Sequence, residues 1–168
     1  VIMCGRYAIK TIPEVMQVAF GYEDRPNFPP RYNIAPTQPV PVVTIDQGRR
    51  RFVLMRWGFI PGWVKDPKDF PLVFNIRTEG AREKPSFRAA FIRRRALMPA
   101  DAFYEWKTEG RAKTPFMARR PDGGIFAFPA LWETWISPDG SEVDTVALIT
   151  GPSAPPLSSI HHLSLIHI

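Results

Sequence analysis

The sequence predicts an α+β fold: a single domain built on a curved, mostly antiparallel, barrel-like β-sheet with short helices. Three observations predict it. Apolar residues make up 45% of the 168 residues, which is enough for one domain with a buried core. Proline occurs 19 times, which disfavours long helices. Segments with strand-like composition outnumber the helical ones, and many of them are bounded by Gly, Pro or Asp turns.

The first part of the chain is predicted to contain one strand, one helix and one loop. Residues 4–9 form the strand. Thr11 and Glu14 have the spacing of a capping box, so a helix is predicted to begin there, and Gly21 can close it. Residues 22–31 are rich in proline and are predicted as a loop.

The rest of the chain is predicted mainly as strands, with one short helix at 87–94 that Ser86 can cap. In order, the predicted strands are 40–45, 51–56, 72–78, 96–99, 103–107, 115–119, 125–130 and 143–150. Residues 151–168 are rich in Pro and Ser and contain no clear element. The domain is therefore predicted to span residues 3–162, followed by an atypical tail at 163–168.

Charge and cysteine content limit the class of protein. The chain has 22 Lys and Arg against 16 Asp and Glu, and a net charge of +6 suits a polyanionic partner without establishing one. Cys4 is the only cysteine, which excludes an intrachain disulfide and a cysteine-based metal site. The sequence shows no signal peptide and no apolar run long enough to cross a membrane. We expect a cytoplasmic, nucleoid-associated monomer without a cofactor or a metal.

Cys4 directly follows Met3, and this position gives the cysteine a second interpretation. A lone cysteine is usually a small buried hydrophobe. If Met3 is the true start and is removed, Cys4 carries a free α-amine beside its thiol. The amine can form a Schiff base with an aldehyde, and the thiol can then close a five-membered thiazolidine. Both groups titrate near neutrality, at about 8 for the amine and about 8.5 for the thiol.

Several polar side chains are candidates for contacts with a phosphate backbone. In a predicted strand, Asn75, Arg77 and Glu79 alternate onto one face, where they either contact phosphates and base edges or are simply solvated. The arginine runs at 49–51 and 93–95 are more often solvated surfaces than binding sites, although they can follow a phosphate backbone.

Two sets of titratable residues are candidates for proton transfer. Glu105 lies among aromatic residues, where partial desolvation raises the pKa of a carboxyl group. The alternative is a Glu105 that faces water and pairs with Lys107. His161 and His162 can each act as a general acid, but adjacent histidines in a Pro- and Ser-rich tail are usually inert.

A cluster of aromatic residues allows two interpretations. Trp57, Phe59 and Trp63 lie among Gly and Pro, next to Arg56. Aromatic side chains on loops near arginine suit the stacking of unpaired bases. The alternative is a loop that caps the hydrophobic core.

Taken together, these segments resemble the SOS-response-associated peptidase family, whose members are also called abasic site processing proteins. The resemblance covers nearly the whole chain, and the segments occur in the family's order. The matching stretches are residues 3–7 (MCGRY), 31–36 (RYNIAP), 57–61 (WGFIP), 75–79 (NIRTE), 99–106 (PADAFYEW) and 159–161 (SIH).

The resemblance implies a DNA-damage response enzyme that forms a thiazolidine crosslink with abasic sites in single-stranded DNA. Cys4 would supply both the amine and the thiol after removal of the preceding residues. Asn75 would position the amine and the sugar, Glu105 would transfer protons in Schiff-base formation and crosslink reversal, and His161 would help to open the deoxyribose ring. The DNA contacts implied by the resemblance are Arg6, Asn33, Trp57, Trp63 and Arg77.

Two other functions stay open at the level of the sequence. A thiol peptidase that acts on itself would use Cys4 as nucleophile and His161 as base. A noncovalent single-strand binder would keep Cys4 as a structural residue, and its binding would not depend on an abasic site.

The sequence departs from the family in three ways. Val1 and Ile2 precede Met3, and an extended N-terminus would block the α-amine. His161 is followed by another His and Leu163, where the family has an acidic or polar residue, Arg and a Pro-containing strand. The chain also ends where the family adds further strands and a helix. We therefore expect a chain that is incomplete or out of frame near its C-terminus, less stable and slower to crosslink.

Overall fold

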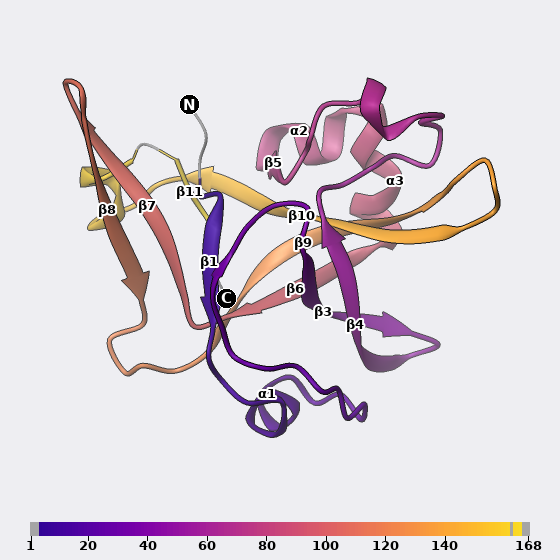
Figure 1. Ribbon diagram of the computed structural model, residues 1–168, viewed down its shortest axis with the longest axis horizontal. Coiled ribbons are helices and arrows are strands. Elements are labelled where there is room, and N and C mark those ends of the chain that lie inside the picture. Colours follow the sequence, from indigo (N-terminus) through magenta and orange to yellow (C-terminus); the bar gives the residue numbers. More distant parts are fainter. Residues whose placement is uncertain (1–3, 162, 166–168) are drawn as a thin grey trace.

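The computed structural model describes residues 4–161 and 163–165, and it shows short helices packed around two β-sheets (Figure 1). The strands are β1 (Arg6–Ile9), β2 (Arg31–Ile34), β3 (Pro39–Asp46), β4 (Arg49–Trp57), β5 (Asn75–Arg77), β6 (Arg95–Ala100), β7 (Ala102–Glu109), β8 (Ala112–Arg119), β9 (Phe126–Ile136), β10 (Glu142–Pro152) and β11 (Leu163–Leu165). The helices are α1 (Pro13–Phe20), α2 (Thr78–Glu83) and α3 (Pro85–Arg93), with 3-10 turns η1 (Pro67–Asp69) and η2 (Leu157–Ser159). Among the described helices, none is long and apolar enough to cross a membrane.

Five strands close into a barrel in the order β4-β3-β6-β9-β10. Neighbours are antiparallel except where β10 meets β4, a parallel pair that sets Thr145 beside Arg56. β10 also pairs in parallel with the short strand β5, and its last residues pair with β11. Closure of the barrel leaves these five strands with few open edges.

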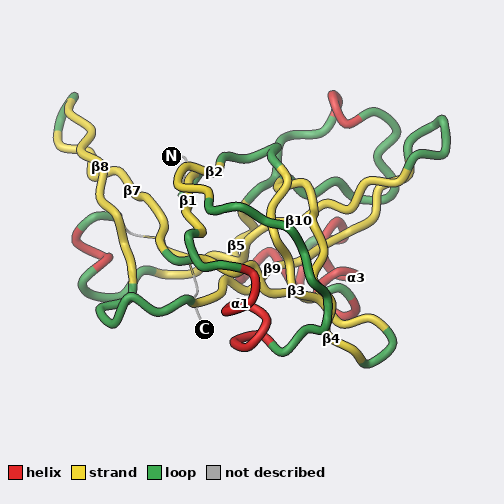
Figure 2. The backbone as a smooth tube through the Cα atoms, turned by 60° about the horizontal axis from the view of Figure 1, so that its bottom comes forward, coloured by secondary structure: helices red, strands yellow, loops and turns green. Residues whose placement is uncertain are grey.

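A second, antiparallel sheet with the order β2-β1-β7-β8 continues from the barrel, because only Asp101 separates β6 from β7. The buried Asp101 carboxylate accepts hydrogen bonds from the backbone N–H groups of Lys10 (2.6 Å) and Thr11 (2.8 Å) and from the Thr11 hydroxyl (2.6 Å). These bonds hold the end of β1 against the corner between the two sheets. Figure 2 shows β7 and β8 extending to one side of the barrel strands.

The main core lies where the second sheet meets the barrel. The Tyr7 ring of β1 packs edge-on against Trp57, at 5.3 Å between centroids, and against Phe128, at 6.2 Å. A second cluster lies under α2 and α3, where Phe59 meets Phe87 edge-on. Buried aromatic pairs of this geometry stabilise by area and by ring electrostatics, and here they fix β1 relative to the barrel.

The fold class predicted from the sequence is confirmed, whereas the predicted helix starts are wrong. Thr11 forms no capping box, because its hydroxyl is bonded to Asp101 and α1 begins after Ile12 without a side-chain cap. Gly21 ends α1 in the left-handed conformation (φ 68°), as predicted. The next long helix, α3, begins one residue before Ser86, which therefore does not cap it.

The predicted strand at 72–78 is much shorter in the structure. Regular pairing is confined to β5, so Asn75 and Arg77 share a strand while Glu79 lies in the first turn of α2. The prediction that Glu79 lies on the strand face is therefore wrong. The cause is a change from strand to helix at Thr78, whose hydroxyl donates to the carbonyl of Thr150 in β10.

Two strands were not predicted. β2 is four residues long and directly follows the proline-rich loop, so it offers little periodicity. β11 lies in the segment for which no clear element was expected, and it pairs with residues Thr150 to Pro152 of β10. The division into a domain at 3–162 and a tail at 163–168 stays a prediction. Residues 1–3, 162 and 166–168 lie outside the described residues.

Candidate functional site

Three segments far apart in the sequence meet at Cys4. Arg6 of β1 pairs with Tyr104 of β7 in antiparallel register, which brings Cys4, two residues before β1, close to Glu105. The backbone nitrogen of Cys4 donates to Glu105 Oε1 at 2.9 Å. From β5, Asn75 Nδ2 donates to the carbonyl oxygen of Cys4 at 3.5 Å, the long limit of a hydrogen bond. The polar backbone atoms on both sides of Cys4 are thus held by predicted site residues.

The Cys4 nitrogen in this chain is a peptide N–H, joined to Met3. It marks the position that an α-amine would take if the residues before Cys4 were removed. A neutral amine at this place would be within hydrogen-bond distance of a carboxyl group, which is the contact that proton transfer requires.

The Cys4 thiol is held in a nonpolar setting. Only 1% of the residue is exposed, and Sγ donates to the carbonyl oxygen of Arg6 at 3.5 Å. Burial, and then the nearby Glu105 carboxylate, raise the pKa of the Cys4 thiol well above its usual range. The thiol therefore stays protonated at neutral pH unless a neighbouring base takes its proton.

Glu105 is buried rather than solvated. It is 4% exposed, and Lys107, its predicted alternative partner, instead forms an ion pair with Glu109 at 2.7 Å. The interpretation of Glu105 as a water-facing partner of Lys107 is therefore wrong. Burial raises the pKa of the Glu105 carboxyl, and the Cys4 N–H and the nearby His161 offset part of this rise. A carboxyl group with a raised pKa is suited to exchange protons closer to neutrality.

His161 belongs to the same neighbourhood. It follows the 3-10 turn η2, and its backbone N–H donates to the carbonyl oxygen of Leu157 at 3.0 Å. The side chain is half-buried and lies near enough to Glu105 to lower the pKa of that carboxyl. The adjacent His162 lies outside the described residues.

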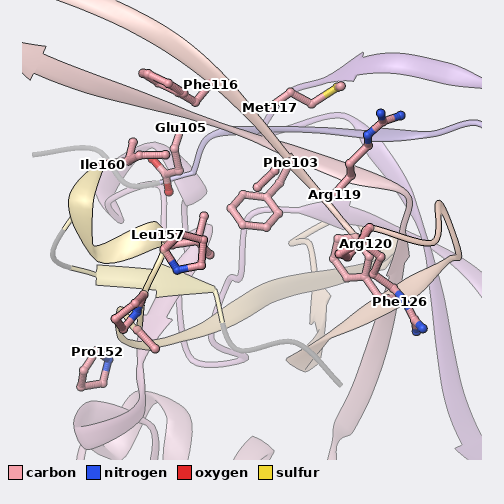
Figure 3. Close-up of a pocket in the computed structure, with 15 residues that line it drawn as sticks. Phe103, Glu105, Phe116, Met117, Arg119, Arg120, Phe126, Pro152, Leu157 and Ile160 are labelled. Carbon is pink, nitrogen blue, oxygen red and sulfur yellow. The ribbon is translucent and has the colours of Figure 1, made fainter.

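A cavity of about 720 Å³ lies between the β7–β8 hairpin and the segment from Pro152 to Ile160. Figure 3 shows Glu105 at one end of this cavity, beside Ile160 and Phe116. Arg119 and Arg120 lie toward the other end. Its walls are mostly nonpolar. Apart from Glu105, the residues that line this cavity were not predicted from the sequence as site residues. The pairing of Glu105 with Phe116 follows from the β7–β8 hairpin once both strands are extended to the turn.

Four of the five predicted DNA contacts are exposed, whereas the prediction for Trp57 is wrong because this residue is buried. Arg6 and Asn33 are exposed and joined by a hydrogen bond of 3.0 Å, next to Cys4, and Arg77 is exposed at the end of β5. Trp63 is 66% exposed and packs edge-on against the ring of Phe70, in the loop before β5. Trp57 is 0% exposed and packs in the core, so its indole offers no surface on which a base could stack.

The arginine runs are largely occupied within the fold. Arg50 donates to the carbonyl oxygen of Phe20, and Arg51 forms a two-pronged contact with Asp24. In the second run, Arg94 pairs with a glutamate of β9 at 2.5 Å. These three side chains are held by contacts within the fold, whereas the sequence favoured solvated surfaces for both runs.

Replacing Glu105 with glutamine is expected to raise the melting temperature at neutral pH. The folded-state pKa of Glu105 is raised, so its stability contribution is complete below the unfolded pKa of about 4.3 and is lost as the pH rises through the folded value. Glutamine keeps the shape without the buried charge. In thermal unfolding, the melting temperature of Glu105→Gln should thus be higher than that of the wild type near pH 8 and equal to it near pH 4.

The matched control for this measurement is Glu109→Gln on the same strand. Glu109 is exposed, and the hydrogen bond with Lys107 lowers its pKa, so its replacement should leave stability unchanged or slightly reduced near pH 8. A Glu105→Gln protein that is less stable than the wild type near pH 8 would show that the charged carboxylate gains more from the Cys4 N–H and the nearby His161 than its burial costs.

Comparison with known proteins gives a consistent result. The family model described as SOS response associated peptidase (SRAP) matches residues 3–164. The abasic site processing protein YoqW of Bacillus subtilis is 34% identical over 163 residues, which cover 95% of this chain and 73% of YoqW. The abasic site processing protein YedK of Escherichia coli is 30% identical, with 95% of this chain and 72% of YedK covered.

Solved structures share the fold. A protein from Bacteroides thetaiotaomicron superposes with a TM-score of 0.89 at 22% sequence identity, covering 98% of this chain and 77% of that protein. A protein from Bordetella bronchiseptica superposes with a TM-score of 0.83 at 23% identity, covering 98% of this chain and 83% of the other. At such identities the likeness concerns the fold.

Proposed function

Because the chain belongs to the SOS response associated peptidase (SRAP) family, we propose that it processes abasic sites in single-stranded DNA by forming a thiazolidine with Cys4. The names of its relatives as abasic site processing proteins support the substrate. The observation that carries the proposal is the pair of contacts at Cys4, in which Glu105 meets the nitrogen and Asn75 meets the carbonyl oxygen.

The reaction needs an amine and a thiol on one residue and an aldehyde on the DNA. Removal of the residues before Cys4 provides the amine. Its lone pair attacks the C1′ aldehyde of the ring-opened sugar, and loss of one water gives a Schiff base. The Cys4 sulfur then adds to the C1′ carbon, its proton moves to the nitrogen, and a five-membered ring closes. One water leaves overall, and no oxidation or reduction takes place.

Glu105 is proposed to move the protons in these steps. Loss of water requires an acid, and attack by sulfur requires a base, because burial keeps the Cys4 thiol protonated. A carboxyl group that is 2.9 Å from the nitrogen, with a raised pKa, can serve in both protonation states. Asn75 is proposed to orient the Cys4 backbone, so that the amine faces the sugar.

His161 is proposed to protonate the sugar ring oxygen during opening. This role is supported by its position near Glu105 and by the cavity into which Glu105 projects. The cavity reaches within one hydrogen bond of Cys4, so it offers a path by which a sugar could approach the buried site. We propose Arg6, Asn33, Arg77 and Trp63 as contacts to the flanking DNA.

A thiol peptidase is supported less well by the same geometry. Such an enzyme stabilises a thiolate by means of a nearby cation, whereas the neighbour of Cys4 is a carboxyl group that raises the thiol pKa. The thiazolidine route begins with the amine, so it tolerates a protonated thiol. Cleavage of the bond before Cys4 remains necessary for that route, by this chain or by another enzyme.

Intact-mass analysis tests the proposal directly. After incubation with an oligonucleotide carrying one abasic site, the crosslinked species should have the mass of a protein beginning at Cys4 plus the oligonucleotide, minus one water. Protein that retains Met3 should remain unlinked in the same sample, since its Cys4 nitrogen is an amide.

The control is the same oligonucleotide with an intact base at that position, which offers no aldehyde. A crosslinked species that still contains Val1, or an equal amount of adduct with the intact oligonucleotide, would contradict the mechanism.

A further inference from the structure

A hollow lies on the solvent face of the second sheet, and two of its lining residues, Met117 and Arg119, also line the cavity at Glu105. Ala8 of β1 and Ala102 of β7 are paired directly, and their short side chains leave space between larger neighbours. The hollow has a volume of about 180 Å³, and its walls include Tyr32, Tyr104 and Met117. Its size and its aromatic walls suit one flat ring.

The strand register places this hollow on the same face as Arg6. Arg6 pairs with Tyr104, which in turn pairs with Met117, and paired residues point to the same side of a sheet. Ala102 pairs with Arg119 on that side as well. Arg6 thus lies between Cys4 and the hollow, whereas Lys10 and Arg119 lie at its far rim.

Tyr32 is held in place at the edge of the hollow. Its side chain is 64% exposed, and its backbone carbonyl oxygen accepts a hydrogen bond of 2.9 Å from the Tyr104 hydroxyl. This bond reaches from β7 across β1 to β2. An exposed ring on a braced strand is a platform for stacking that needs little ordering when a ligand binds.

The charge at the hollow is positive. Arg6, Lys10 and Arg119 are exposed, and within residues 4–161 none of them takes part in a salt bridge. The nearby carboxylate of Asp101 is buried and accepts three hydrogen bonds from the turn after β1, so its oxygens are occupied. Three exposed cations around an aromatic hollow match a phosphate backbone with unpaired bases.

We propose that this hollow binds a nucleotide of the single strand that flanks the abasic sugar, with its base against Tyr32 and its phosphates at Lys10 and Arg119. The proposal rests on the function proposed above. Six residues of extended chain separate Cys4 from Lys10, which corresponds to roughly 20 Å. The bound nucleotide therefore lies several positions from the abasic site, and Arg6 contacts the strand on the way.

Oligonucleotides of different length test this site. One abasic site is placed in single strands with one, three, five or seven nucleotides on either side, and the concentration for half-maximal crosslinking is measured. The wild type should bind more tightly once one arm is long enough to reach the hollow. In Lys10→Ala/Arg119→Ala this gain should disappear, and the slope of log affinity against log salt should fall by about 1.4 for two lost phosphate contacts.

The matched control is Arg25→Ala/Arg49→Ala, which removes two exposed positive charges from the loop after α1 and the first position of β4. It should keep both the length dependence and the salt slope. A second pair of variants tests the ring: Tyr32→Ala should weaken binding of the long oligonucleotide about tenfold, while Tyr32→Phe stays within about twofold of the wild type.

The outcomes separate this proposal from the proposed function. If no variant and no wild-type sample crosslinks at saturating oligonucleotide, the thiazolidine mechanism fails. If the wild type crosslinks but shows no length dependence, or if the Lys10 and Arg119 substitutions behave like the control, the hollow does not bind the flanking strand. In the expected result, crosslinking rates at saturation stay unchanged for Tyr32→Ala and Tyr32→Phe, because Tyr32 does not line the cavity at Glu105. For Lys10→Ala/Arg119→Ala the test is the length dependence and the salt slope, because Arg119 lines that cavity as well.

Discussion

Replacing Cys4 with alanine is expected to abolish the heat-stable adduct with abasic single-stranded DNA. Alanine keeps the α-amine, so a Schiff base can still form, but no sulfur is present to close the ring. A Schiff base hydrolyses on heating in water, whereas a thiazolidine persists. The measurement is the fraction of labelled oligonucleotide that migrates with the protein on a denaturing gel after heating.

Cys4→Ser separates ring closure from simple loss of a side chain. Serine has nearly the same size as cysteine, but its hydroxyl closes the ring poorly, so at most a labile adduct is expected. Because Cys4 is buried in the main core, the melting temperature of each variant must be shown to remain above the assay temperature. A heat-stable adduct formed by a folded Cys4→Ala protein would refute the assignment.

Glu105→Gln is expected to slow crosslinking by about 10²- to 10⁴-fold, the usual range for loss of a positioned proton donor or acceptor. Glutamine can still accept a hydrogen bond from the Cys4 nitrogen, so the geometry at Cys4 is kept. The pH profile should change as well. In the wild type, the single-turnover rate should vary as the Glu105 carboxyl titrates above its ordinary pKa, and Glu105→Gln should lack that variation.

Glu109→Gln is the control for this prediction, since Glu109 lies on the same strand, is exposed and pairs with Lys107. It should crosslink at the wild-type rate with the wild-type pH profile. A Glu105→Gln protein with an unchanged rate and profile would show that the proton is moved by another group, and His161 would then be the first to test.

The sequence indicates which residue types could act at a site, but it does not indicate whether each of them is buried or exposed. For Glu105, the sequence left both a desolvated carboxyl group and a water-facing partner of Lys107 open, and the structure buries the residue. Likewise, Trp57 and Trp63 have similar local sequences rich in Gly and Pro, yet one is fully buried and the other exposed. That difference depends on whether Tyr7 and Phe74 lie opposite the ring, which is long-range packing that local composition does not encode.

The secondary structure likewise contains elements that the local sequence determines and elements that distant partners determine. The strands of the hairpins β3–β4 and β7–β8 were predicted because a short Gly-containing segment separates two stretches of strand-like composition in each case. The extent of β5 was not predicted, because its three residues are set by parallel pairing with β10 rather than by their own pattern. Thr11 likewise has the spacing of a helix cap, but its hydroxyl finds Asp101, 90 residues away.

The parallel pairing of β5 with β10 also determines at which stage of synthesis and folding the contacts at Cys4 can form. The contacts at Cys4 join residues 71 and 101 positions apart, and β5 is held by pairing with a strand that is made about 70 residues later. Such contacts close large loops, so they are expected late in folding and make folding slow. During synthesis, Glu105 can reach Cys4 only after β7 has left the ribosome, and Asn75 only after β10 has done so. The emerging chain would therefore carry its cysteine for most of its synthesis without the groups that direct it toward an aldehyde.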